Sequence, residues 1–138
     1  RSRQKGLILL ASSLEQCRPY VDEKQLENHS NRLSQTSTKP LTWIVAANSH
    51  CPVGLTGSRP TIAIRITQHK LIKQLCGELN APVISTSANI SGRSPARNRY
   101  IIHRHFKDKV DFILQGFDTG SQAASEIRDI TTGAILRS

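Results

Sequence analysis

Short apolar runs, bounded by polar residues, recur along the chain and predict the strands of a sheet. These runs are residues 6–11, 41–46, 61–66, 82–84, 110–114, 125–130 and 134–137. Their lengths are typical of strands and too short for buried helices. The run 6–11 (Gly-Leu-Ile-Leu-Leu-Ala) is continuously apolar, which predicts a strand buried on both faces.

Helical patterns lie between these runs. Apolar residues recur at helical spacing over 68–79, and residues 98–107 predict a basic helix. A helix is expected to start at 13–16 and to stop at Pro19. The polar segment 22–39 predicts a short helix followed by a loop, and residues 48–59 predict a second loop. Strands that alternate with helices predict an α/β fold, with a twisted mixed β-sheet flanked by helices.

Composition narrows the class of protein. The chain has 138 residues, which is typical of one domain (residues 1–138), and only 4% are aromatic, so the core must consist mainly of aliphatic residues. It lacks the apolar stretch of about 18 residues that a membrane span needs. Cys17, Cys51 and Cys76 show no CxxC spacing, which favours free thiols in a reducing compartment such as the cytoplasm.

Positive charge is in excess and is unevenly distributed. The chain carries 19 Lys and Arg against 10 Asp and Glu, a formal net charge of +9. One concentration lies between residues 93 and 109, where Asp108 is the single acid. Such a stripe attracts phosphate, either of a nucleotide or of a nucleic-acid backbone. A solvated basic surface without a partner is the alternative.

The strongest local signal for chemistry is residues 85–92, Ser-Thr-Ser-Ala-Asn-Ile-Ser-Gly, which follow a predicted strand. Ligands of α/β proteins bind at the carboxyl ends of strands, and small side chains let backbone N–H groups approach an anion. Ser87 would hydrogen-bond a phosphate or ribose oxygen. Asn89 would donate to and accept from a base or a ribose. An ordinary serine-rich turn is the alternative.

Three cations are further candidates. Arg65 ends an apolar strand, where its guanidinium can hold a carboxylate through two hydrogen bonds. Arg1 and Lys5 precede the first strand, where they would hold a polyphosphate. Plain surface cations are the alternative for all three. The chain lacks GxSxG, HExxH, GxxxxGK(S/T) and GxGxxG motifs, so chemistry that works by positioning and by stabilising phosphate charge is favoured over covalent or metal catalysis.

Five segments carry the motifs of one known family, in that family's order. Residues 85–92 reproduce its S-T-S-A-N-x-S-G motif, the most specific of the five. The other four are residues 1–10 (K-x-R…K-G-L-I-L), 40–42 (G-P-L/V-T), 55–67 (L-T-G…S/T-x-A-V-R) and 125–137 (S-E-I-R-D…G-x-I/L-x-R). With these motifs the chain resembles the YrdC/TsaC family of L-threonylcarbamoyladenylate synthases, in its shorter bacterial branch.

The resemblance implies a YrdC/RibB-like fold and a reaction that joins L-threonine, bicarbonate and ATP into threonylcarbamoyl-AMP, with release of pyrophosphate, for N6-threonylcarbamoyladenosine in tRNA. It also implies roles for nine residues. Those that would hold ATP are Arg1, Lys5, Ser87, Asn89 and Arg137. Those that would bind threonine or line its pocket with the nucleotide are Arg65, Thr61, Ser85 and Ser125. Mg²⁺ would come with the ATP, without a protein ligand that the motifs identify. Other implied partners are tRNA or double-stranded RNA, and the other proteins of tRNA threonylcarbamoylation.

The sequence departs from the family at its start. The family's opening strand and helix, with a Y-P-T-E turn, should precede Arg1 and are missing, as is the lysine of K-x-R. We therefore expect the chain to be part of a longer protein, and we expect this polypeptide by itself to be weakly active or inactive. The alternatives to an enzyme are a non-catalytic RNA-binding module of the same fold and a nucleotide-binding regulatory domain of a larger enzyme.

Overall fold

The computed structural model describes residues 7–35, 37, 39–89, 95–96, 98–114 and 125–137. These residues divide into two compact units. The larger unit holds the described residues of 7–85 and 125–137, and the smaller unit holds those between 86 and 114. Within the described ranges, no helix is both long and apolar enough to cross a membrane.

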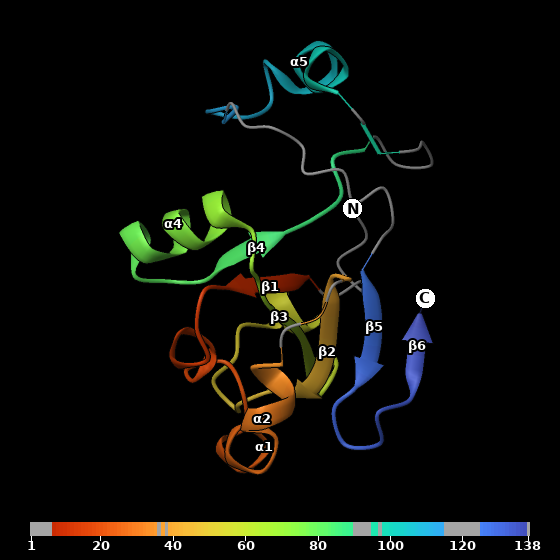
Figure 1. The fold of residues 1–138 in the computed structure, drawn as a ribbon. Coiled ribbons are helices and arrows are strands. Elements are labelled where there is room, and N and C mark those ends of the chain that lie inside the picture. Colours follow the sequence, from red (N-terminus) through yellow and green to blue (C-terminus); the bar gives the residue numbers. More distant parts are fainter. Residues whose placement is uncertain are drawn as a thin grey trace. The chain divides into compact units, whose positions relative to one another are not determined.

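The larger unit is built on one mixed sheet in the order β4-β1-β3-β2-β5-β6 (Figure 1). Its strands are β1 (Ile8–Ala11), β2 (Leu41–Ala46), β3 (Thr61–Ile66), β4 (Val83–Ser85), β5 (Glu126–Asp129) and β6 (Ile135–Arg137). The pairs β1–β3 and β2–β5 are parallel, and the pairs β1–β4, β2–β3 and β5–β6 are antiparallel. The predicted α/β fold with a mixed sheet is confirmed.

The two faces of this sheet differ. Side chains alternate between faces along a strand, and in β3 Ile62 and Ile64 are buried whereas Thr61, Ala63 and Arg65 are partly exposed. We call the first side the core face and the second the open face. The core face packs against buried side chains of four short helical segments: η1 (Glu15–Cys17), α1 (Glu23–Asn28), α2 (Ser30–Leu33) and α3 (Val53–Thr56).

Two longer helices complete the described structure. In the larger unit, α4 (Lys70–Leu79) contacts β1, where the Cys76 thiol donates to the Leu10 carbonyl over 3.7 Å. It ends at Asn80, which takes a left-handed conformation with φ of 47°. In the smaller unit, α5 (Arg99–Phe106) begins where the Asn98 side chain accepts the backbone N–H of Ile101 over 2.9 Å. That contact is a typical N-cap.

Most predicted strands and both longer helices are confirmed, with ends that shift by one or two residues. Residues 110–114 are the clear error, because they form no strand, and Phe112 is 76% exposed. An apolar run forms a strand only beside a partner, and no pairing to this run is found among the described residues.

The helical predictions need smaller corrections. The helix expected at 13–16 is only the 3-10 turn η1, the segment 22–39 forms α1 and α2, and the loop at 48–59 contains α3. The prediction that the first strand is buried on both faces is also wrong, because Leu9 and Ala11 are buried whereas Ile8 and Leu10 are partly exposed. The reason is that Ile8 and Leu10 lie on the open face.

Candidate functional site

Register places three of the predicted site residues on the open face, on the strands at one side of the sheet. Residues directly opposite each other on paired strands point to the same face. Ser85 of β4 is opposite Ile8, which is opposite Ala63 of β3. Since Thr61 and Arg65 each lie two residues from Ala63, they share this face with Ser85.

The same reasoning extends across the other strands. Thr42 of β2 and Arg137 of β6 are both opposite Ile127 of β5. Ser125 precedes Ile127 by two residues and therefore shares its face. The hydrogen bonds described below join Thr42 and Ser125 to Arg65. All five predicted site residues that the structure describes in the larger unit thus lie on one face of the sheet.

A hydrogen-bonded cluster joins Arg65 to its neighbours. The Arg65 Nε donates to Thr42 Oγ1 over 3.1 Å, and the Arg65 Nη2 donates to Ser125 Oγ over 2.8 Å. The Thr42 hydroxyl in turn donates to Ser125 Oγ over 3.0 Å. Thr42 is fully buried and Ser125 is 5% exposed. The Arg65 guanidinium is therefore positioned by two buried hydroxyl groups.

Arg137 reaches the same serine from the edge of the sheet. Its Nη2 donates to the Ser125 carbonyl oxygen over 2.9 Å and lies 3.5 Å from Ser125 Oγ. The turn before β6 sets this position, because Asp129 Oδ1 accepts the backbone N–H groups of Thr131 and Thr132, and Gly133 takes a φ of 75°. Two guanidinium groups therefore converge on one serine.

The electrostatics of this cluster favour an anion. Burial, and secondly the positive charge of Arg137, lower the pKa of Arg65 from its ordinary value. Arginine stays charged in proteins, so both groups remain cations. Within the described part of the chain, neither one forms an ion pair with a carboxylate. Arg65 is partly desolvated and Arg137 is exposed, and two such adjacent cations without a counter-ion among the described residues form a site that a carboxylate or phosphate would neutralise.

Thr61 and Ser85 share the open face but stand apart from this cluster. Thr61 lies four positions before Arg65, which is about 13 Å along a strand. Ser85 is level with Ala63, between them along the sheet. Both side chains are half-buried.

Ser87 and Asn89 belong to the smaller unit and are described there alone. The Ser87 hydroxyl donates to the Asn89 side-chain oxygen, and the Asn89 N–H donates to the Ser87 carbonyl over 2.9 Å. The two side chains predicted to hold ATP are therefore neighbours. Arg1 and Lys5, also predicted to hold ATP, lie outside the described residues, as do residues 90–92 of the motif.

Thr42 is the site residue that sequence reasoning missed. It belongs to the quoted motif at 40–42, yet we expected no role for it. Its signal is that it is the single polar side chain in the run Leu-Thr-Trp-Ile-Val-Ala, where a fully buried hydroxyl needs a partner. Arg65 and Ser125 are those partners.

Known proteins are similar to this sequence along its length. A family model named for Sua5, YciO and YrdC, with the description "Telomere recombination", matches residues 1–138. The threonylcarbamoyl-AMP synthase of Photorhabdus laumondii is 41% identical over 138 residues, which cover 99% of this chain and 72% of that protein. The protein of the same name from Cellvibrio japonicus is 37% identical over 137 residues, with the same coverage.

Solved structures share the fold. P. abyssi Sua5 in complex with L-threonine superposes with a TM-score of 0.83 at 26% identity, over 99% of this chain and 41% of that chain. E. coli YciO superposes with a TM-score of 0.75 at 22% identity, over 98% of this chain and 66% of that chain, which supports the fold alone. The expected family resemblance is therefore confirmed, and the chain belongs to the Sua5/YciO/YrdC family.

Proposed function

We propose that the protein containing this chain is a threonylcarbamoyl-AMP synthase, which converts L-threonine, bicarbonate and ATP into threonylcarbamoyl-AMP and pyrophosphate. The threonine amine and bicarbonate form a carbamate with loss of water. A carbamate oxygen then attacks the α-phosphorus of ATP and displaces pyrophosphate. The product supplies the threonylcarbamoyl group for tRNA modification, together with the other proteins of that process.

One observation supports this proposal most strongly: Arg65 and Arg137 converge on Ser125 without a carboxylate partner among the described residues. The reactants are a carboxylate, a bicarbonate and a triphosphate, so the site must neutralise several negative charges. In our proposal Arg65 holds the threonine carboxylate and Arg137 contacts the nucleotide. Thr42, Arg65 and, over 3.5 Å, Arg137 all donate to Ser125 Oγ, so its lone pairs are used and its proton remains for a substrate oxygen.

The remaining assignments are proposals of the same kind. Thr61 and Ser85 line the open face beside the reactants, and Ser87 and Asn89 contact ATP together with Arg1 and Lys5. Among the described residues, no group of three or more His, Cys, Asp or Glu side chains gathers to hold a metal ion. In our proposal Mg²⁺ arrives on the phosphates of ATP and keeps several of its water ligands.

The cytoplasm is the compartment that we propose. Cys17 and Cys76 are buried and Cys51 is half-buried, and all three are free thiols. A non-catalytic RNA-binding module is the less favoured alternative, because the relatives are named as synthases and the cationic cluster is intact on the open face.

An omission assay on the complete natural protein tests the proposed reaction. Pyrophosphate release should require threonine, bicarbonate and ATP together, and threonylcarbamoyl-AMP should be detected by mass spectrometry. Arg18→Gln is a suitable control variant, because Arg18 is a surface arginine that pairs with Glu15. Neither residue belongs to the hydrogen-bonded cluster of Arg65, Ser125 and Arg137. Release that continues without threonine in the wild-type protein would reject the assignment.

A further inference from the structure

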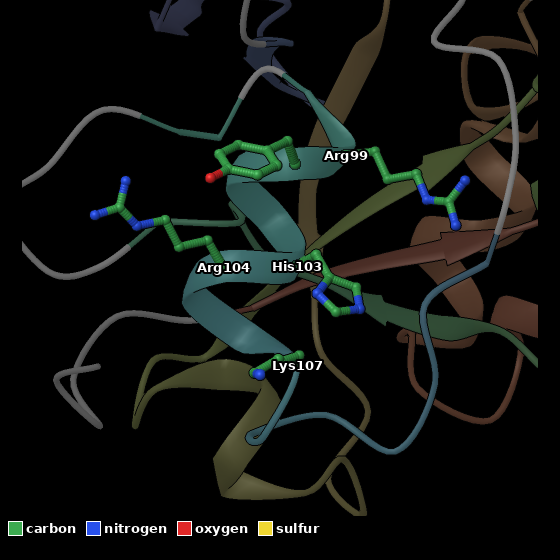
Figure 2. Close-up of a pocket in the computed structure, with 5 residues that line it drawn as sticks. Arg99, His103, Arg104 and Lys107 are labelled. Atoms are coloured by element: carbon green, nitrogen blue, oxygen red, sulfur yellow. The ribbon is translucent and has the colours of Figure 1, made fainter.

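Exposed arginines of this chain differ in what holds their side chains. Arg18 pairs with Glu15 of its own segment. The cations of helix α5 line an open hollow (Figure 2), and within the described ranges none of them forms an ion pair. Arg32 of α2 is also exposed, yet its Nη1 donates to the Ile130 carbonyl over 2.8 Å and to the Thr131 carbonyl over 3.3 Å. Arg32 therefore connects α2 to a segment that follows 98 residues later.

The two carbonyls belong to the turn that joins β5 to β6. Asp129 satisfies the donors of this turn, because its Oδ1 accepts the backbone N–H of Thr131 over 3.0 Å and that of Thr132 over 2.8 Å. Arg32 satisfies two of its acceptors. Backbone polar groups that lose such partners must find others, which shifts the chain. Asp129 from within the turn and Arg32 from α2 thus fix its position together.

The position of β6 depends on this turn. Within the described part of the sheet β6 is an edge strand that pairs only with β5. It has three residues, all exposed, and its register with β5 shifts between Ile127 and Arg128. Two paired strands are marginally stable without further packing. Its last residue, Arg137, donates to the Ser125 carbonyl, so a displaced turn should move Arg137 away from Ser125.

Arg32, in contrast, is attached to the core. The next residue of α2, Leu33, is 2% exposed and belongs to the hydrophobic core. The Leu33 N–H donates to the His29 carbonyl over 2.9 Å, which fixes the backbone around Arg32. Figure 1 shows α2 at the end of the sheet where β5 turns into β6. The helix is therefore the fixed partner of this contact, and the edge strand is the partner whose position it can set.

We propose that Arg32 is a positioning residue for the nucleotide: by holding the β5–β6 turn, it keeps Arg137 beside Ser125. This proposal rests on the proposed function, in which Arg137 contacts ATP. Arg65 has supports of its own, because it donates to the hydroxyl groups of Thr42 and Ser125. Loss of the Arg32 contacts should therefore affect ATP much more than threonine.

Binding measurements on the complete natural protein test this difference. Arg32→Met keeps an extended aliphatic side chain and removes the donors. Dissociation constants for ATP and for L-threonine are measured separately by isothermal titration calorimetry. The Kd for ATP should rise about 10-fold, the scale of one hydrogen bond of ordinary strength, and the Kd for threonine should change by less than about 2-fold. Arg18→Met is the control, and it should leave both constants unchanged.

A double variant tests whether Arg32 acts through Arg137. Arg137→Met should itself weaken ATP binding. If the effect of Arg32 passes through Arg137, Arg32→Met should cause no further loss of ATP affinity in that background, whereas two independent contributions would add.

Three results would each overturn the proposal. They are a normal ATP Kd for Arg32→Met, an equal loss of threonine affinity, and additive losses in the double variant. Normal ATP binding by Arg137→Met would reject the nucleotide role of Arg137, and the proposal with it. Pyrophosphate release in the omission assay is measured separately, so failure of the synthase assignment is distinguishable from failure of the role of Arg32.

Discussion

Arg65 and Ser125 are 60 residues apart in the sequence, yet the Arg65 Nη2 donates to Ser125 Oγ over 2.8 Å. The bond crosses β2, which separates β3 from β5 in the sheet. It brings the end of one motif, 55–67, to the start of another, 125–137. Two of the five motifs that carry the family resemblance therefore meet at Ser125, and Arg137 of the second motif donates to the carbonyl oxygen of the same serine.

Replacing Arg65 tests the assignment of the threonine carboxylate. Arg65→Ala should raise the KM for threonine by about 10²-fold, the scale expected when a charged hydrogen bond of about 2–3 kcal/mol is lost. The KM for threonine is measured from pyrophosphate release in the complete protein, with Arg18→Ala as the control. An unchanged threonine KM would show that Arg65 does not hold the substrate.

Thr42 should act by positioning Arg65. Thr42→Val keeps the shape of the buried side chain but leaves the Arg65 Nε without its hydroxyl partner. We expect a loss of about 1–3 kcal/mol in the free energy of unfolding together with a higher KM for threonine, because a partly buried donor is left unsatisfied. Thr42→Ser retains the hydroxyl and should restore the threonine KM. If the valine variant is destabilised but keeps a normal KM, Thr42 has a purely structural role.

Asp129 should stabilise the β5–β6 turn in a pH-dependent way. Hydrogen bonds from the backbone and hydroxyl of Thr132, and from the Thr131 N–H, lower the pKa of the Asp129 carboxyl from its ordinary value. A lowered folded-state pKa stabilises the fold above the unfolded-state pKa, and this stabilisation is lost as the pH falls through the folded-state value.

The comparison of wild type with Asp129→Asn measures this contribution. Denaturant unfolding at neutral pH should show that the variant is less stable, and the difference should shrink as the pH falls below about 4. Thr131→Ala is the control, because the backbone N–H of Thr131 and not its side chain contacts Asp129. A difference that stays constant with pH would contradict the account.

Cys17 should be the inert thiol of the chain. Burial, and secondly the neighbouring Cys76, raise its pKa from 9.0 to about 12. Native protein treated with iodoacetamide near pH 8 should therefore be labelled first at Cys51, which is only half-buried, as measured by mass spectrometry. Because the unfolded thiol ionises first, the stability that Cys17 contributes is complete below pH 9 and is lost as the pH rises toward 12. Labelling of Cys17 as fast as that of Cys51 would contradict this prediction.

Local patterns were sufficient to predict much of this fold. The run Thr-Ile-Ala-Ile-Arg-Ile at 61–66 alternates between a core face and an open face, and both the strand and the position of Arg65 follow from it. Residues 110–114 show the limit of such patterns, because whether an apolar run pairs as a strand depends on distant residues.

The candidate site was also only partly predictable from local sequence patterns. Motifs named Arg65, Ser125 and Arg137 separately, but their convergence depends on the order of β3, β2, β5 and β6, which no local pattern encodes. Thr42 was missed because its role exists only through partners that are 23 and 83 residues away.

The most direct test of the central claim is a crystal structure of the complete natural protein with L-threonine and a non-hydrolysable ATP analogue. We predict the threonine carboxylate within hydrogen-bond distance of the Arg65 guanidinium, with Ser125 facing the bound reactants. Threonine bound away from the open face, with the Arg65–Ser125 cluster touching no substrate, would contradict the account.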